Sequence, residues 1–191
     1  NDFATVAGGE INIASGVYSS VFGGDTNEAS GSLASVSGGR SDIASGRESS
    51  VFGGFSNDAN NTNAVVVGGR KNIASGSNSV VSGGGFNTAS GDASSVFGGS
   101  LNEASNDFAT VAGGEINIAS GVYSSVFGGD TNAASGSLAS VSGGRIVIAS
   151  GRESSVFVGV SHDAHNTNPV RGGGRKYISC GPNSCRLARC F

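Results

Sequence analysis

The stretch SSVFGGDTNEASG, residues 19–31, decides the fold because the chain repeats it. It returns as SSVFGGDTNAASG at residues 124–136, and looser copies fill the sequence between. When the chain is cut every fifteen residues from Asn1, the copies align without a gap through residue 180. A strict period of this kind indicates a solenoid, in which each repeat packs only on its neighbours.

The positions of each repeat, numbered here as columns 1 to 15, show which side chains face inward. Column 6 is Val in eleven consecutive repeats, from Val6 to Val156, and column 14 is Ala in the same eleven, from Ala14 to Ala164. Column 9 is Gly throughout, column 8 is almost always Gly, and column 12 is usually Asn. Glycine-rich corners suit short strands joined by tight turns. Because side chains alternate across a strand, columns 4, 6, 12 and 14 are predicted to face inward, and columns 5, 7, 13 and 15 outward.

These columns predict an all-β fold, a two-faced β-solenoid (β-roll) of about twelve 15-residue coils. The interior would be Val opposite Ala, with small Ser and Ala residues and a ladder of Asn. Stacked Asn side chains can bond to each other and to the turn backbone, which offsets the cost of burying them. At the interstrand spacing of about 4.8 Å, the rod would be roughly 55–60 Å long.

A second symmetry divides the chain into two related blocks. Residues 1–86 align with residues 106–191, so a seven-coil block, residues 1–105, is duplicated from residue 106. The second copy diverges near its end, where Arg171 and Arg186 occupy the Val column and Pro169 falls in a predicted strand. A charge cannot keep the packing of a buried Val. We therefore predict a regular β-solenoid over residues 1–165, and a divergent cap or an unstructured end over residues 166–191.

The placement of charge singles out one outward face. Through the first eleven coils, Lys, Arg, Asp and Glu occupy the corner columns 2, 3, 10 and 11 or column 13, and Asp42 in column 12 is the exception. Columns 5 and 7 carry no charge in these coils. A long, uncharged, half-apolar strip usually marks a contact surface. The predicted site residues are Thr5, Ala7, Ser20, Phe22, Ser35, Ser37, Ser50, Phe52, Val65, Val67, Val80, Ser82, Ser95, Phe97, Thr110, Ala112, Ser125, Phe127, Ser140, Ser142, Ser155 and Phe157.

A rigid and regularly spaced strip of this kind suits the surface of an ice crystal. Hydroxyls and methyls at a fixed spacing can order water into positions that continue a lattice, whereas charges would disrupt that order. A rigid protein also loses little conformational entropy when it adsorbs. The need for the same group at the same spacing would explain why the sequence repeats. The expected partner is therefore an ice crystal surface.

The half-repeat G-x-x-N-x-[VA]-[SG] resembles the x-x-N-x-V-x-G repeats of the ryegrass-type β-roll antifreeze proteins over roughly residues 1–165. That resemblance implies a left-handed two-faced roll with inward Val and Asn ladders, in which one flat outward face binds ice. It maps columns 5 and 7 onto the ice-facing columns. It further implies a secreted antifreeze protein that causes thermal hysteresis or inhibits recrystallisation, and we expect a monomer.

Two other functions stay open. The repeat S-V-x-G-G-x-x-N-x-A-S-G is similar to the head repeats of bacterial trimeric autotransporter adhesins, whose rolls associate in threes. In that case the Phe residues of column 7 would form an oligomer seam, and the protein would be a trimer. A third hypothesis is a structural surface-layer or extracellular matrix rod.

Catalysis is not expected, and no catalytic residue is predicted. The two histidines are His162 and His165, and nothing in the sequence places a Ser–His–Asp arrangement around either of them. Their H-x-x-H spacing could hold a metal, but a drifted loop is the preferred interpretation, so no metal or other cofactor is predicted. Cys180, Cys185 and Cys190 suggest either a local disulfide in a cap with one thiol left over, or accidental sequence drift.

Composition bears on partners and location. The net charge of −3 provides no basic footprint for nucleic acid, and no apolar run approaches the ~20 residues that a membrane span needs. The sequence Asn60-Asn61-Thr62 is a glycosylation acceptor site at a predicted corner, which favours a secreted or extracellular protein.

Overall fold

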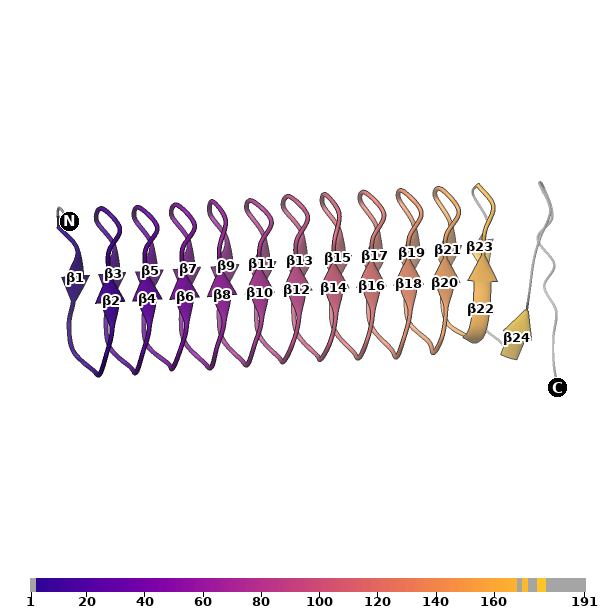
Figure 1. Ribbon diagram of the computed structural model, residues 1–191. Coiled ribbons are helices and arrows are strands. Elements are labelled where there is room, and N and C mark those ends of the chain that lie inside the picture. The colour runs from indigo at the N-terminus through magenta and orange to yellow at the C-terminus, as the bar shows by residue number, and fades with distance from the viewer. Residues whose placement is uncertain (1–2, 168–169, 172–174, 178–191) are drawn as a thin grey trace.

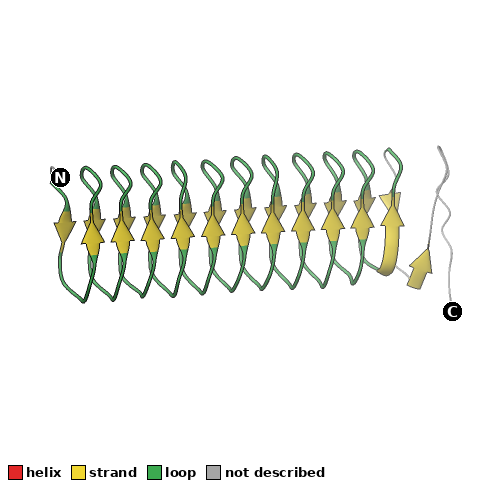
Figure 2. Cartoon of the chain, in the orientation of Figure 1, coloured by secondary structure: helices red, strands yellow, loops and turns green. Residues whose placement is uncertain are grey.

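A computed structural model describes residues 3–167, 170–171 and 175–177. These residues form a straight stack of coils with two short strands in each coil and loops between the strands (Figures 1 and 2). The strands belong to two parallel sheets that lie face to face. The predicted all-β β-solenoid is therefore confirmed. The described residues include no helix of the length and apolarity that a membrane span requires.

The first sheet consists of the odd-numbered strands in chain order. They are β1 Thr5–Val6, β3 Ser20–Val21, β5 Ser35–Val36, β7 Ser50–Val51, β9 Val65–Val66, β11 Val80–Val81, β13 Ser95–Val96, β15 Thr110–Val111, β17 Ser125–Val126, β19 Ser140–Val141, β21 Ser155–Val156 and β23 Val170–Arg171. Each residue pairs with the residue fifteen positions later, as Val21 does with Val36. The fifteen-residue period of the sequence is thus the register of the sheet.

The second sheet consists of the even-numbered strands. They are β2 Ile13–Ala14, β4 Glu28–Ala29, β6 Ile43–Ala44, β8 Asp58–Ala59, β10 Ile73–Ala74, β12 Thr88–Ala89, β14 Glu103–Ala104, β16 Ile118–Ala119, β18 Ala133–Ala134, β20 Ile148–Ala149, β22 Val160–Ala164 and β24 Arg175–Tyr177. Strand β22 is longer than the others because pairing there begins at the corner residue Val160.

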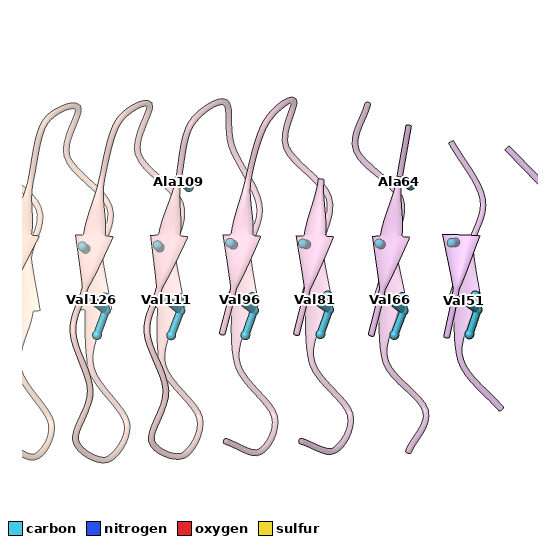
Figure 3. Packing of buried hydrophobic residues seen from close by; sticks show 14 of the residues in the cluster. Val51, Ala64, Val66, Val81, Val96, Ala109, Val111 and Val126 are labelled. Carbon is cyan, nitrogen blue, oxygen red and sulfur yellow. The ribbon is translucent and has the colours of Figure 1, made fainter. Parts of the chain in front are cut away.

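The core lies between the sheets and contains the small residues that the columns predict. The Val residues of column 6 from Val21 to Val156 and the Ala residues of column 14 from Ala29 to Ala164 are fully buried. Figure 3 shows the Val side chains stacked in one row from coil to coil. Column 4 contributes buried Ala or Ser, such as Ala64 and Ser79. Such small side chains let the two sheets approach closely.

The predicted Asn ladder is present. Each buried Asn of column 12 hydrogen-bonds to the next coil. Asn102 shows the pattern: its Nδ2 donates to the carbonyl oxygens of Gly98 and Gly114, both at 2.9 Å. Its Oδ1 accepts the backbone N–H of Asn117 at 2.9 Å. Each buried amide therefore makes three hydrogen bonds, two of them to the adjoining coil. Asp42, Val147 and His162 occupy the same column and interrupt this pattern.

The corners contain a feature that the glycine pattern does not predict. In the eleven coils through Ser161, the residues of columns 3 and 11 all adopt the left-handed conformation, with φ between 51° and 60°, and none of them is glycine. This set includes β-branched residues such as Ile116, for which left-handed backbone is costly. Corner side chains also stack on one another between coils, as Phe108 and Tyr123 do at 4.6 Å between ring centroids.

Only part of the C-terminal segment is described. In β23 the backbone of Arg171 pairs with Val156, so the first sheet continues into this segment. Pro169, Arg186 and the three cysteines lie outside the described residues. The expectation of a divergent cap or an unstructured end over residues 166–191 stays a prediction.

Candidate functional site

The candidate site is the outward surface of the first sheet, formed by columns 5 and 7 and called here the uncharged face. Column 5 side chains are half-buried from Ser20 onward, whereas column 7 side chains are exposed, except for the half-buried Ser82. The five phenylalanines are 53–60% exposed, and they are Phe22, Phe52, Phe97, Phe127 and Phe157. The structure therefore places the predicted site residues on one outward surface, as the alternation of side chains requires.

Hydrogen bonding makes this face rigid and regular. The backbone N–H of Ser20 donates to the carbonyl of Ala34, and that of Phe22 donates to the carbonyl of Val36, both at 2.9 Å. Equivalent bonds recur from coil to coil, so neighbouring column 5 hydroxyls lie side by side at the interstrand spacing of about 4.8 Å. The coils are aligned along a straight axis (Figure 1), which keeps the rows parallel over the length of the face.

The two outward faces differ in charge. Over the described residues the uncharged face has no ionisable side chain in columns 5 and 7. The opposite surface, columns 13 and 15, carries acids among isoleucines and serines, and we call it the acidic face; its acids are Glu28, Asp58, Glu103 and Asp163. Asp58 pairs in the sheet with Ile43 and Ile73, and burial raises the pKa of its carboxyl. Only one side of the roll thus offers a surface free of charge.

The phenylalanines make the surface of the uncharged face uneven. They occupy column 7 in coils 2, 4, 7, 9 and 11, where coil 1 is residues 1–15 and coil 2 is residues 16–30. The intervening coils have Ala, Ser or Val in this column. A phenyl ring extends further from the sheet than these side chains do. The column 5 row of Ser, Thr and Val is therefore the more level of the two rows.

A constellation that the sequence reasoning missed lies on the acidic face at coil 11. His165 Nδ1 lies 2.6 Å from Ser150 Oγ, and His165 Nε2 contacts a carboxylate oxygen of Asp163. The expectation that nothing places a Ser–His–Asp arrangement is therefore wrong. The period could have revealed it, because Ser150 and His165 are fifteen residues apart and Asp163 is on the same face of the strand, two residues from His165.

The surroundings of this triad do not support acyl transfer. Such a reaction needs backbone N–H donors aimed at the developing oxyanion. The backbone amides of Ser150 and of the next residue, Gly151, both donate to the carbonyl of Ala164 at 3.0 Å as part of the coil ladder. The His165 side chain is also 59% exposed, so water is not excluded. The hydroxyl, imidazole and carboxylate form an open hydrogen-bonded chain on a sheet surface.

The H-x-x-H pair does not converge on a common site. His162 is buried in the Asn column of the interior, whereas His165 lies exposed on the acidic face. Within the described ranges, no three His, Cys, Asp or Glu side chains form a group suited to hold a metal ion. The cysteines fall outside those ranges.

Comparison with known proteins adds no family assignment. The sequence matches no protein-family model. A search of curated proteins finds no similar chain.

Proposed function

We propose that this protein binds ice through the uncharged face and inhibits ice growth or recrystallisation by adsorption. The observation that carries the proposal is the contrast between the two faces of one rigid roll. Both have the same coil spacing, but column 13 of the acidic face carries four acids, whereas neither column of the uncharged face carries a charge. A charged side chain orients water around itself rather than into a lattice. The acidic face is therefore the less suitable surface for binding ice.

The chemistry of the face fits this role. Column 5 presents hydroxyls from Thr5 to Ser155, interrupted by the methyls of Val65 and Val80. Hydroxyls hydrogen-bond to water, and apolar groups order the first layer of water without binding it. Since each strand is already hydrogen-bonded to both neighbours, adsorption immobilises few additional groups and costs little entropy.

One pair of matched variants tests the face. Ser50 lies on the uncharged face and Ser45 lies five residues earlier on the acidic face. We expect Ser50→Lys to abolish thermal hysteresis and the shaping of ice crystals, and Ser45→Lys to leave both unchanged. Circular dichroism checks that each variant stays folded. Equal loss from the two variants would contradict the assignment of the face, and unaltered ice in the presence of wild-type protein would refute the function.

A second candidate is an adhesin-like extracellular head, favoured by the five exposed phenylalanines of column 7. In that function the phenyl rows pack between three copies of the chain. Sedimentation would then give a trimer, and ice would grow normally. Either function suits an extracellular location, which we also propose; the acceptor residue Asn60 is exposed at the end of strand β8.

A further inference from the structure

The order of large and small side chains in column 7 has a self-complementary register. Two copies of the roll can meet through their uncharged faces about a two-fold axis parallel to the strands. In this arrangement the long axes of the two rolls are antiparallel, and the strands of the two contacting sheets run in the same direction. Column 7 then lies opposite column 7. If coil 6 of one copy faces coil 6 of the other, coil 2 faces coil 10 and coil 4 faces coil 8.

In this register every phenylalanine faces a smaller side chain. Phe22 meets Ser142, and Phe52 meets Ala112. The remaining contacts are Phe97 with Val67, Phe127 with Ser37, and Phe157 with Ala7.

A shift of one coil in either direction destroys the fit. One shift places Phe22 opposite Phe127, and the other places Phe22 opposite Phe157. The exposed rings of one copy thus fit between the rings of the other copy at the register centred on coil 6, and not when the copies are shifted by one coil. Core packing rewards this kind of interdigitation.

The corner charges favour the same register. At one edge of the seam Asp25 falls beside Arg145, and Arg40 falls beside Asp130, each in column 10. At the other edge Arg47 falls beside Asp107, both in column 2. These charge pairs flank the seam and are exposed to solvent, where salt screens attraction over about 8–10 Å. They therefore select the register more than they add affinity.

Two further arrangements avoid the contact between phenylalanines but fail on charge. A shift of two coils that centres the pair on coil 5 places Asp25 beside Glu115 and Glu10 beside Asp130, which are like charges; the opposite shift places Phe97 of one copy opposite Phe97 of the other. If the coil axes of the two copies were parallel, each Phe of column 7 would face a column 5 side chain. Glu115 of one copy would then lie beside Asp107 of the other, and these are like charges. The antiparallel register centred on coil 6 avoids both problems.

The area of the face is sufficient for a stable pair. Eleven coils at about 4.8 Å, with about four extended residues of roughly 3.3 Å each, make a contact of about 700 Å² on each partner. Standard protein interfaces bury about 800 Å² per partner. The exposed phenyl rings supply much of this area, and their burial drives association.

We propose that the partner of the uncharged face in solution is a second copy of this chain, packed antiparallel about a two-fold axis at coil 6. The pair covers the phenylalanines and the column 5 hydroxyls together. Its formation does not rest on ice binding. If the face also binds ice, the monomer is the active form, and hysteresis per molecule falls as protein concentration passes the dissociation constant of the pair.

Sedimentation velocity of the full chain over a range of concentrations tests the pair. Wild type is expected to pass from monomer to dimer. Ala112→Phe places a ring opposite Phe52 at two symmetric contacts, and we expect it to weaken the dimer at least about tenfold. Adding Phe52→Ala to that variant exchanges the ring and the gap, so the double variant should regain most of the affinity.

Controls and contrary outcomes follow from the register. Ala133→Phe adds the same ring on the acidic face and should leave the dimer unchanged. Circular dichroism checks the fold of each variant. A monomer at every concentration, or a trimer, would overturn the proposal. So would independent effects of Phe52→Ala and Ala112→Phe, which is the result that a parallel pair predicts, because column 7 then faces column 5. Hysteresis measured well below the dissociation constant reports on ice binding separately.

Discussion

Replacing Asp42 by Asn should stabilise the protein, because it repairs the buried ladder. Asp42 has no exposed surface, and its Oδ2 is buried without a hydrogen-bond partner among the described residues. Asn57, one coil along, uses its Nδ2 at the equivalent position to donate to Gly53 and Gly69 at 3.0 and 3.1 Å. Asp42→Asn adds two such bonds and removes an unsatisfied acceptor, so we expect a gain of about 2–4 kcal/mol in the free energy of unfolding at neutral pH.

The gain should depend on pH in a defined direction. Burial raises the pKa of the Asp42 carboxyl above its usual value, against the hydrogen bond that it accepts from the N–H of Asn57. Between the unfolded pKa of about 3.9 and the raised folded pKa, the folded state binds more protons, so its stability falls as pH rises through that window. Below the window the protonated acid can donate one hydrogen bond, whereas the amide of Asn donates two. The advantage of Asn is therefore smaller near pH 3 than at neutral pH.

Urea unfolding followed by circular dichroism at pH 3 and pH 7.5 measures this difference. Because the ladder neighbours of Asp42 are Asn27 and Asn57, which are uncharged, the difference between variant and wild type isolates one carboxyl. Asn117→Asp introduces the same defect in another coil and should lower stability by a similar amount at pH 7.5. A gain that is equal at the two pH values, or a less stable variant at pH 7.5, would refute the reasoning.

Three more substitutions test the backbone and the ladder, each by the midpoint of urea unfolding. Gly99→Ala should cost at least about 3 kcal/mol, because φ is +81° and the added Cβ would lie 2.1 Å from the carbonyl oxygen of Gly114, whereas Gly98→Ala meets nothing within 4 Å and should be nearly neutral. Val147→Asn should stabilise by about 1–2 kcal/mol by restoring the amide donor in coil 10. Ile116→Asn should stabilise by about 1 kcal/mol, because Asn tolerates φ of +54° better than a β-branched residue does; a loss of stability would show that its exposed side chain matters more than its backbone.

The residues of the uncharged face were predictable from the sequence, because side chains alternate between the two sides of a strand. Knowing that Val21 faces inward is enough to place Ser20 and Phe22 outward, and the structure agrees. The Ser150–His165–Asp163 chain was equally open to such reasoning, because register alone brings the three together. The signal in the sequence is weak, because His165 stands in a column that is otherwise Ser, with one Asn, through the first eleven coils.

The sequence by itself determined the period, the inward columns and the charge-free face, because sheet pairing joins residues fifteen positions apart and the inward side chains meet across one thin core. Tertiary structure alone decided the left-handed backbone at columns 3 and 11, where residues as different as Phe108, Glu48 and Ile116 adopt the same φ. The physical reason is that the ladder on both sides constrains each corner to one path. Closure of the coil therefore overrides the local preference of whichever side chain occupies the turn.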